Sequence, residues 1–365
     1  MTDQTMAPSA SHSYPCAQCG ARVEFAPGTN ALRCPYCGHL QQLVETGRQV
    51  QEHAYGELAQ LPRKPVAGLA AHVFSCQKCG AKTESNAISE LCQFCGAPLV
   101  AELNAGELVV PEAVLPFALD RGAVREAVRK WVKSRWFAPN RLKKVSDTEQ
   151  LKGTYLPHWT YDSKTVSDYT GQRGEHYYTT ETYTDSDGNT QTRQVQHTNW
   201  YPASGTVSRD FDDVLIPATQ HVERKQLDRL EPWPLHEAMP YQPDYLAGYQ
   251  ALRYDMEPES GLDVAKGKMA PVIERDCRSD IGGDEQRVNS VDTRYFDLTF
   301  KLMLLPVWIA AYLYAGKTFQ VLVNARTGEV LGQRPYSVWK ILFAVLIAIV
   351  VVALVITFFA LRQHH

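Results

Sequence analysis

Eight cysteines in four Cys-x-x-Cys-Gly pairs constrain the N-terminal part of this chain more than any other feature. Two residues between cysteines let one tight turn direct both thiolates at one ion, and the following glycine permits a left-handed backbone. The pairs are separated by gaps of 14 and 12 residues, which is typical of zinc ribbons. The sequence therefore predicts two ribbons with one Zn²⁺ each, bound by Cys16, Cys19, Cys34 and Cys37 and by Cys76, Cys79, Cys92 and Cys95.

Other uses of these cysteines fit less well. An arrangement that exchanges pairs between the ribbons has to bridge the 38 residues between Cys37 and Cys76. Disulfides do not persist in a reducing cytosol, and a thioredoxin-like site has one such pair in a βαβ context. His39 follows a ligand closely but is not expected to bind the metal, and Cys277 is expected to be an ordinary thiol.

The other end of the chain carries an apolar run, Ile341–Leu361, of 21 residues without a charge. As a helix it is about 31 Å long, which matches the hydrocarbon thickness of a bilayer. Trp339, Lys340 and Arg362 flank the run, as expected at the two interfaces. We predict a transmembrane helix over residues 339–362.

The flanking charges predict the topology. Three basic residues lie within 20 residues before the helix and one follows it, which places the long N-terminal part in the cytoplasm. Residues 1–15 lack the apolar stretch of a signal peptide and indicate a disordered leader. We expect a single-pass protein of the inner, cytoplasmic membrane.

Both ribbons are nearly neutral. Residues 16–45 hold two arginines and two glutamates, and residues 72–103 hold two lysines and three glutamates. Nucleic-acid binding depends on neutralising phosphates, and the formal charge of the whole chain is −3. Protein docking or a structural role is therefore favoured for the ribbons, with nucleic-acid binding as the weaker alternative.

A basic amphipathic helix is predicted over residues 120–136, with Asp120 as its N-cap. We favour a packing in which the apolar face lies on the body and the basic face is solvated. Contact of the basic face with anionic phospholipid, or with nucleic acid, is the alternative. The apolar face holds Val124, Ala127, Val128, Trp131 and Val132, and the basic stripe holds Arg121, Arg125, Arg129 and Lys133.

Residues 104–335, which include this helix, are predicted to form a mostly antiparallel α+β body. An Asp-Gly turn between "HYYTTETYT" and "QTRQVQHTNW" indicates a polar hairpin near 175–198 that projects into solvent. The Leu-Pro-x-Trp shared by 156–159 and 305–308 hints at a duplicated β unit. Other expected elements are strands at 204–219 and 246–256, a helix over 261–278, buried strands in 302–314 and a hairpin in 317–332.

No catalytic constellation is recognisable, so no catalytic or cofactor-binding residue is assigned and no enzyme activity is expected. "AGKT" at 315–318 lacks the first glycine of a phosphate loop, which favours a hairpin for Lys317 and Thr318. Asp210–Asp213 offers carboxylates to a cation, but a solvated turn is favoured. The scattered histidines are expected on the surface or hydrogen-bonded in the core: His158, His176, His197, His221 and His236.

The parts therefore follow in the order leader (1–15), first ribbon (16–45), linker (46–71), second ribbon (72–103), body (104–335) and membrane helix (339–362). In this order they resemble the bacterial YdjG-like zinc-ribbon membrane proteins, many of which carry the label of a primosomal protein or helicase. The resemblance covers nearly the whole chain and is carried by the CxxCG pairs, by "LPHWTYD" and by "VNARTGEVLGQRPYS".

The resemblance implies zinc at the eight cysteines, membrane anchoring and no enzyme activity. It also implies association with flotillin-like (SPFH-domain) and PspA-type coat proteins in envelope stress. A helicase label does not fit a sequence without a phosphate loop.

We expect a tail-anchored scaffold that holds a protein partner against the cytoplasmic face of the membrane. The first alternative is a membrane-tethered regulator that binds nucleic acid through the basic helix. The second is an enzyme in the β body, which would need a pocket with convergent polar groups.

Overall fold

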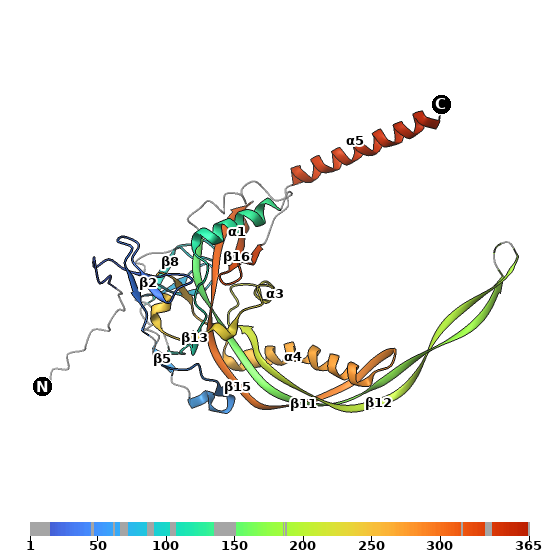
Figure 1. Cartoon of the computed structure of the whole chain (residues 1–365), viewed down its shortest axis with the longest axis horizontal. Coiled ribbons are helices and arrows are strands. Elements are labelled where there is room, and N and C mark those ends of the chain that lie inside the picture. Colours follow the sequence, from blue (N-terminus) through green and yellow to red (C-terminus); the bar gives the residue numbers. More distant parts are fainter. Residues whose placement is uncertain are drawn as a thin grey trace.

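The computed structural model describes residues 15–44, 47–60, 63–65, 72–85, 91–102, 107–134, 151–184, 186, 188–314, 317–332 and 338–363. The ribbons lie at one end, a curved β arm extends from the other, and the C-terminal helix projects separately (Figure 1). The described residues form a mostly β body with few helices, as the sequence predicts.

The ribbons and the segment between them contain short elements. They are β1 (Glu24–Phe25), β2 (Ala31–Arg33), β3 (Leu40–Gln42), β4 (His53–Ala54), η1 (Tyr55–Gln60), β5 (Arg63–Pro65), β6 (His72–Cys76), β7 (Lys82–Ser85) and β8 (Leu99–Glu102). Part of the predicted linker belongs to the body, because β4 pairs with residues Thr299 and Phe300 of a body strand.

The body and C-terminal region hold the longer elements. They are β9 (Glu107–Val109), β10 (Ala113–Val114), α1 (Arg121–Lys133), β11 (Lys152–Thr184), β12 (Thr190–Pro217), α3 (Arg224–Asp228), η3 (Leu235–Glu237), β13 (Met239–Pro240), η4 (Pro243–Leu246), β14 (Gln250–Leu252), α4 (Pro258–Ile281), β15 (Glu285–Tyr314), β16 (Lys317–Asn324), β17 (Val330–Gly332) and α5 (Val338–Gln363).

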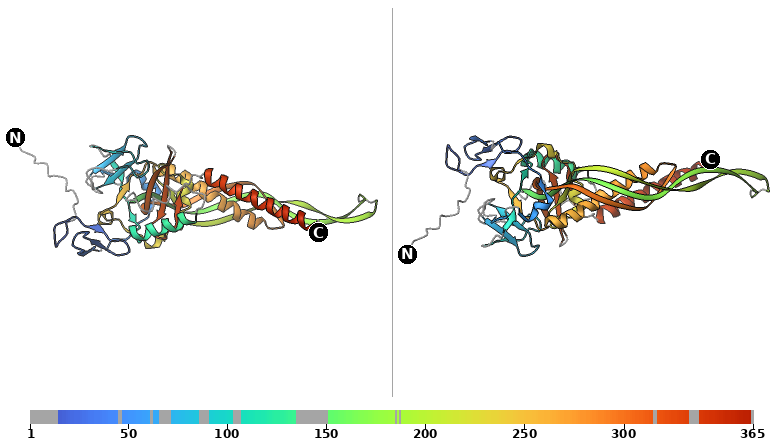
Figure 2. Two further views of the ribbon diagram at one scale, coloured as in Figure 1. Left: turned by 90° about the horizontal axis from the view of Figure 1, so that it is seen from above. Right: turned by 90° about the horizontal axis from the view of Figure 1, so that it is seen from below.

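Three strands of unusual length build the arm. β11 pairs antiparallel with β12 along one side and with β15 along the other, and α4 lies along the concave face of this sheet (Figures 1 and 2). Beyond Gly174 only β11 and β12 continue, as a two-stranded hairpin with mainly exposed side chains. The predicted polar hairpin is therefore confirmed, whereas the division of β12 and β15 into several shorter strands is wrong.

The three strands are irregular at one level of the arm. Asp213 in β12 (φ 51°) and Asp297 in β15 (φ 49°) sit in β-bulges beside Asp162 and Ser163 of β11. The carboxylate of Asp162 accepts hydrogen bonds from the Asp213 N–H (2.6 Å) and the Thr299 hydroxyl (3.1 Å), which fixes both neighbours. Bulges bend a sheet and increase its twist, consistent with the curve of the arm.

The prediction of a solvated turn at Asp210–Asp213 is wrong, because these residues lie within β12. The Asp213 carboxylate pairs with the ammonium of Lys301 at 2.6 Å, and Glu52 from the segment before β4 pairs with the same ammonium. Lys301 is buried, so the two carboxylates supply the partners that a buried cation needs.

The body contains one arrangement of elements twice, on either side of the repeated Leu-Pro-x-Trp. The two motifs pair antiparallel, with Leu156 opposite Leu305. β10 runs parallel to β15, and α1 follows it; β14 runs parallel to β11, and α4 follows it. We take β10, α1 and β11 as one unit and β14, α4 and β15 as the other. The short strand of each unit then pairs with the long strand of the other unit.

α1 begins where the sequence signals predict, whereas α4 does not. The Asp120 carboxylate accepts a hydrogen bond from the Ala123 N–H at 2.7 Å, and α1 ends with Ser134 as its C-cap. Residues 135 and 136 of the predicted helix lie outside the described residues. α4 starts earlier than predicted, at Pro258, a residue that suits the first helical turn.

The strand predicted over 246–256 is wrong in length, because β14 covers only Gln250–Leu252. The preceding residues form η4, and Gly248 has φ 83°, a conformation that breaks a strand. The expected hairpin of β16 and β17 is present, and Lys317 pairs with Tyr314 where β16 lies beside β15. Residues 302–310 are buried, as predicted.

α5 is a 26-residue helix that projects away from the body (Figure 1). Its described apolar side chains are largely exposed, including Leu346, Ile349 and Leu354. Among the residues whose side chains are described, no helix is both long enough and apolar enough to cross a membrane. The transmembrane helix therefore stays a prediction from the sequence.

Candidate metal centres

The first four-cysteine group lies at the N-terminal end of the described chain. The sulfur atoms of Cys16, Cys19, Cys34 and Cys37 all lie within 4.8 Å of one another. Cys16 Sγ is 3.5 Å from Cys37 Sγ, and Cys19 Sγ is 3.6 Å from Cys34 Sγ. In each pair of the ribbon the first cysteine is buried and the second is exposed.

The second group repeats this geometry. The sulfur atoms of Cys76, Cys79, Cys92 and Cys95 again lie within 4.8 Å of one another. Cys76 Sγ is 3.4 Å from Cys95 Sγ, and Cys79 Sγ is 3.6 Å from Cys92 Sγ. Each group takes all four sulfurs from one ribbon, so the alternative in which the ribbons exchange pairs is wrong.

Both groups fit a tetrahedral zinc ion. Four sulfurs at about 2.3 Å from Zn²⁺ are about 3.8 Å apart, close to the distances found here. The glycine after each pair has a positive φ, between 70° and 77°, and its N–H donates to the carbonyl of the first cysteine. Each group can therefore hold one zinc ion, as predicted.

The backbone favours thiolates at these positions. The N–H groups of Cys37 and then Tyr36 lower the pKa of the Cys34 thiol to about 6, although burial opposes this. Burial raises the pKa of Cys76, but the N–H groups of Cys79 and Lys78 outweigh it and bring the pKa to about 7. Because zinc binds thiolates, these donors favour the metal-binding form of Cys34 and Cys76, whereas burial raises the pKa of Cys79 and Cys92.

We call each Cys-x-x-Cys turn a knuckle. The second knuckle of ribbon 2, at Cys92 and Cys95, packs into the body. Phe94, between Cys92 and Cys95, is 3% exposed, and its ring centroid lies 5.7 Å from that of His221. Its carbonyl oxygen accepts a hydrogen bond from the Gln320 side-chain amide at 3.0 Å. β7 also pairs with β14, so this ribbon continues the sheet of the body.

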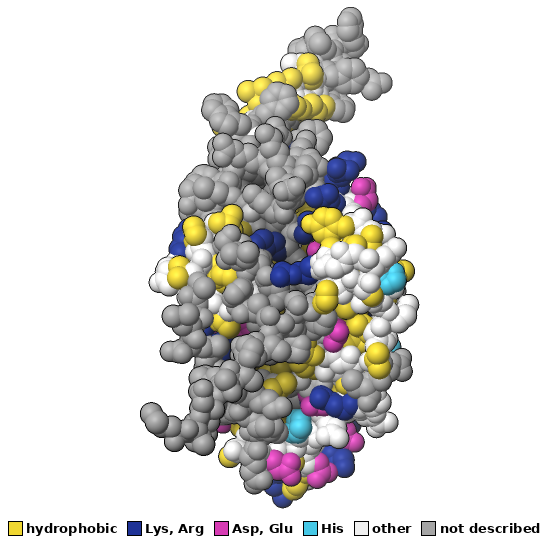
Figure 3. All heavy atoms as spheres, turned by 90° about the vertical axis from the view of Figure 1, so that its left-hand side faces the viewer, with side chains coloured by type: hydrophobic (Ala, Val, Ile, Leu, Met, Phe, Trp, Pro, Cys, Tyr) yellow, Lys and Arg dark blue, Asp and Glu magenta, His cyan; other side chains and the backbone are white. Residues whose placement is uncertain are grey.

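The equivalent knuckle of ribbon 1, at Cys34 and Cys37, is exposed to solvent. Tyr36 occupies the place of Phe94 between the two cysteines and is 83% exposed. Leu40 and Val44, which follow the knuckle, are also exposed. Ribbon 1 contacts the body at its other end, where the Phe25 N–H donates to Ala247 and the Gly28 N–H donates to Phe117. Seen from the ribbon end, hydrophobic side chains reach the surface in several patches (Figure 3).

The sequence did not single out Tyr36 or Phe94. Aligning the two CxxC knuckles would have shown that both carry an aromatic residue at the same position. That alignment does not say which ring is buried, because His221 and Gln320, the partners of Phe94, are far away in the chain.

The remaining candidates do not join the metal groups. Cys277 is buried in α4, and His39 is not part of the first cysteine group. His158 is a buried core residue whose Nδ1 lies 3.0 Å from the Leu156 carbonyl oxygen, and burial lowers its pKa to about 4. His221 pairs with Asp255 at 3.1 Å and His176 with Glu285 at 2.8 Å, whereas His236 is mainly exposed. His197 accepts or donates a hydrogen bond to the Thr179 hydroxyl.

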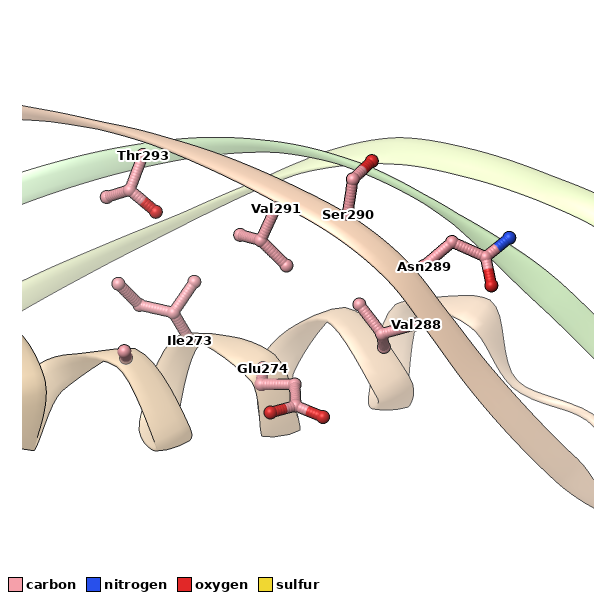
Figure 4. Close-up of a pocket in the computed structure, with 8 residues that line it drawn as sticks. Ile273, Glu274, Val288, Asn289, Ser290, Val291 and Thr293 are labelled. Carbon is pink, nitrogen blue, oxygen red and sulfur yellow. The ribbon is translucent and has the colours of Figure 1, made fainter.

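A groove of about 330 Å³ lies between α4 and β15 in the arm (Figure 4). Ile273, Val288 and Val291 point into it, and Glu274 at its rim is the one acidic residue of its lining, which contains no histidine, cysteine or lysine. Glu274 pairs with Arg278 at 2.6 Å. This lining brings no acid–base pair together, so it gives no positive support to the enzyme alternative.

The fold and the cysteine groups define a class of protein: two zinc ribbons joined to a duplicated β body with a long arm. A search for relatives finds YdjG of Bacillus subtilis, which is described as an uncharacterized protein. It is 27% identical over 342 residues, which cover 90% of this chain and 92% of YdjG. This similarity supports the resemblance to a YdjG-like family. No protein-family profile matches the chain. No solved structure matches it.

Proposed function

We propose that this protein is a membrane-anchored zinc-ribbon scaffold without enzyme activity, in which ribbon 1 docks a protein partner at the cytoplasmic face of the membrane. The observation that carries the proposal is the exposed Tyr36 knuckle. The same position in ribbon 2 is filled by Phe94, which binds the body through an apolar contact and one hydrogen bond. In ribbon 2, this knuckle therefore already serves as a contact surface for another part of the same chain.

The metal makes ribbon 1 suited to this role. A rigid knuckle loses little conformational entropy on docking, and Tyr36 adds a large ring that can bury area at low entropic cost. The neutral charge of the ribbon favours a protein partner over phosphate. The family resemblance implies SPFH-domain (flotillin-like) and PspA-type envelope-stress proteins as partners.

Anchoring by α5 is supported by its 21 uncharged residues and by its exposed apolar side chains. A long apolar helix surface in water is unfavourable, whereas a bilayer would bury it. Deleting residues 338–365 should move the protein from the membrane to the soluble fraction. A truncated protein that stays in the membrane fraction at high salt would contradict the anchor.

The docking role is tested by Tyr36→Ala in the full chain. The ring is exposed, so its removal should leave the zinc content and the folding of the protein unchanged. We expect weaker recovery of proteins that co-purify from membranes, measured by quantitative mass spectrometry. The matched control is Tyr178→Ala, which removes a 60% exposed tyrosine from the hairpin. Equal recovery with both variants would contradict the assignment to ribbon 1.

The basic face of α1 supports a second candidate, a membrane-tethered regulator that binds nucleic acid. Such binding should weaken steeply with salt, because each phosphate contact releases a counterion. A shallow salt dependence with DNA and RNA oligonucleotides would count against it.

A further inference from the structure

We propose that the exposed basic face of α1 binds anionic phospholipid at the membrane surface beside α5. This inference rests on the proposed anchoring, since the anchor is what brings α1 to a bilayer. It assigns a second membrane contact to a helix of the folded body.

The charge of α1 is concentrated on its exposed side. Val124, Val128 and Val132 recur at helical spacing and are buried against the body. The helix holds five basic residues and one acidic residue, Glu126. Of the basic residues, Arg121, Arg129, Lys130 and Lys133 are exposed and Arg125 is half-buried.

α1 is held rigidly against the strands that lead to the anchor. The Trp131 ring covers Gly332 of β17, where an added Cβ would come within 2.5 Å of the ring. At the other end, the Trp308 indole N–H donates to the Leu119 carbonyl at 3.0 Å, and the Arg121 guanidinium lies 5.8 Å from the centre of the Trp308 ring. The helix therefore moves with β15 and β17.

Only a short stretch of chain separates this contact from the anchor. β17 ends at Gly332 and α5 begins at Val338. Six residue steps span at most about 22 Å, so Gly332, on which the Trp131 ring packs, stays within that reach of the first residue of α5. Both helices lie on the same side of the body (Figure 1). When α5 is inserted, its Lys340 end is at the headgroup layer, and the cations of α1 are held near that layer.

Anionic lipid is the partner that this placement favours. Each Lys or Arg near a phosphatidylglycerol surface contributes about a fivefold gain in binding. The tether raises the effective concentration of lipid at α1 regardless of the expression level. Nucleic acid offers the same phosphate chemistry but is not held next to the helix.

The test uses the full chain in nanodiscs of phosphatidylcholine, with and without one quarter phosphatidylglycerol. The readout is hydrogen exchange of the α1 amides, followed by mass spectrometry. We expect phosphatidylglycerol to slow this exchange by about tenfold or more, and moderate salt to remove the effect. Arg129→Gln, Lys130→Gln and Lys133→Gln together should abolish it. The matched control removes three exposed charges at α3: Arg224→Gln, Lys225→Gln and Arg229→Gln.

Failure of this inference is distinguishable from failure of the anchor. A chain that enters both discs but shows equal α1 exchange overturns lipid binding and leaves the anchor in place. A chain that does not enter phosphatidylcholine discs overturns the anchor. In that case, flotation of the chain with phosphatidylglycerol vesicles that is lost only in the α1 variant would uphold the lipid contact. A chain that does not float with these vesicles would overturn the lipid contact. Equal protection of α1 by a DNA duplex would overturn the assignment to lipid.

Discussion

The two ribbons share one metal geometry and differ in what surrounds it. Ribbon 2 contributes Phe94 to the body core, and its strand β7 extends the body sheet. Ribbon 1 keeps a separate three-stranded sheet of β1, β2 and β3, and its Tyr36 knuckle is exposed. A second matched position follows the first pair of each ribbon, where Glu24 is exposed and Glu84 is 1% exposed.

This difference shows that zinc alone does not decide how a ribbon is used. The metal fixes the knuckles in both cases, and the residues beside the cysteines determine whether a knuckle joins a core or stays accessible. Both ribbons pack on the body, but the second knuckle of ribbon 2 is a structural part of it, whereas the second knuckle of ribbon 1 stays accessible.

The largest effect is expected from removing one metal site at a time. Cys34→Ser and Cys92→Ser should each leave one zinc ion per chain, because structural zinc supplies on the order of 10 kcal/mol of folding free energy. Cys34→Ser should unfold ribbon 1 alone. Cys92→Ser should also lower the melting temperature of the body, since β7 and Phe94 are part of it. Metal analysis with calorimetry measures both, and identical melting of the two variants would remove the distinction between the ribbons.

A smaller effect is expected from the two knuckle rings. Phe94→Ala removes a buried ring and should lower the free energy of unfolding by about 3–5 kcal/mol. Tyr36→Ala should change it by less than about 0.5 kcal/mol, because the ring is exposed. Urea unfolding followed by circular dichroism compares them. A large loss in Tyr36→Ala would mean that ribbon 1 is buried against another part of the protein.

The third effect is a pH dependence carried by Glu84, which is small over any one pH unit. Burial raises its pKa to about 8, although the charge of Arg253 lowers it. A carboxyl with a raised pKa in the folded state binds more protons than in the unfolded state. Stability should therefore fall as pH rises from about 4.5 to 8, by at most about 1.4 kcal/mol per pH unit.

Glu84→Gln should flatten this slope, because the amide does not ionise. Glu24→Gln is the matched control and should keep the slope of the natural protein. Unfolding free energies at several pH values provide the measurement. A slope that persists in Glu84→Gln would assign the titration to another group.

The metal sites could be predicted from the sequence because their signal is local. Two residues between cysteines and a following glycine specify each knuckle without reference to the rest of the fold. The Asp120 cap and the polar hairpin are local in the same way: the cap is present, and Thr184 pairs with Thr190 near the tip of the hairpin. The burial of Phe94 is not determined locally, since its contacts come from residues more than 120 positions later.

The length of the arm strands was missed for a related physical reason. Polar stretches such as Asp210–Asp213 have the composition of a turn, and in isolation a turn is the better interpretation. Here the Asp162 carboxylate accepts a hydrogen bond from the Asp213 N–H. The chain therefore passes through a bulge and the strand continues. The repeated motif gave only three identical residues, and its structural counterpart is the matched order of β10 and α1 and of β14 and α4.

The unbroken course of β15 has a mechanical consequence. This strand runs from Glu285 in the arm to Tyr314, and the short β16–β17 hairpin then leads to Gly332. No flexible joint interrupts it at the bulges, because Asp162 ties all three strands together there. A load applied to the arm is therefore carried as tension and bending along β15 into the body sheet, which makes the arm a lever that acts on the strands beside the ribbons.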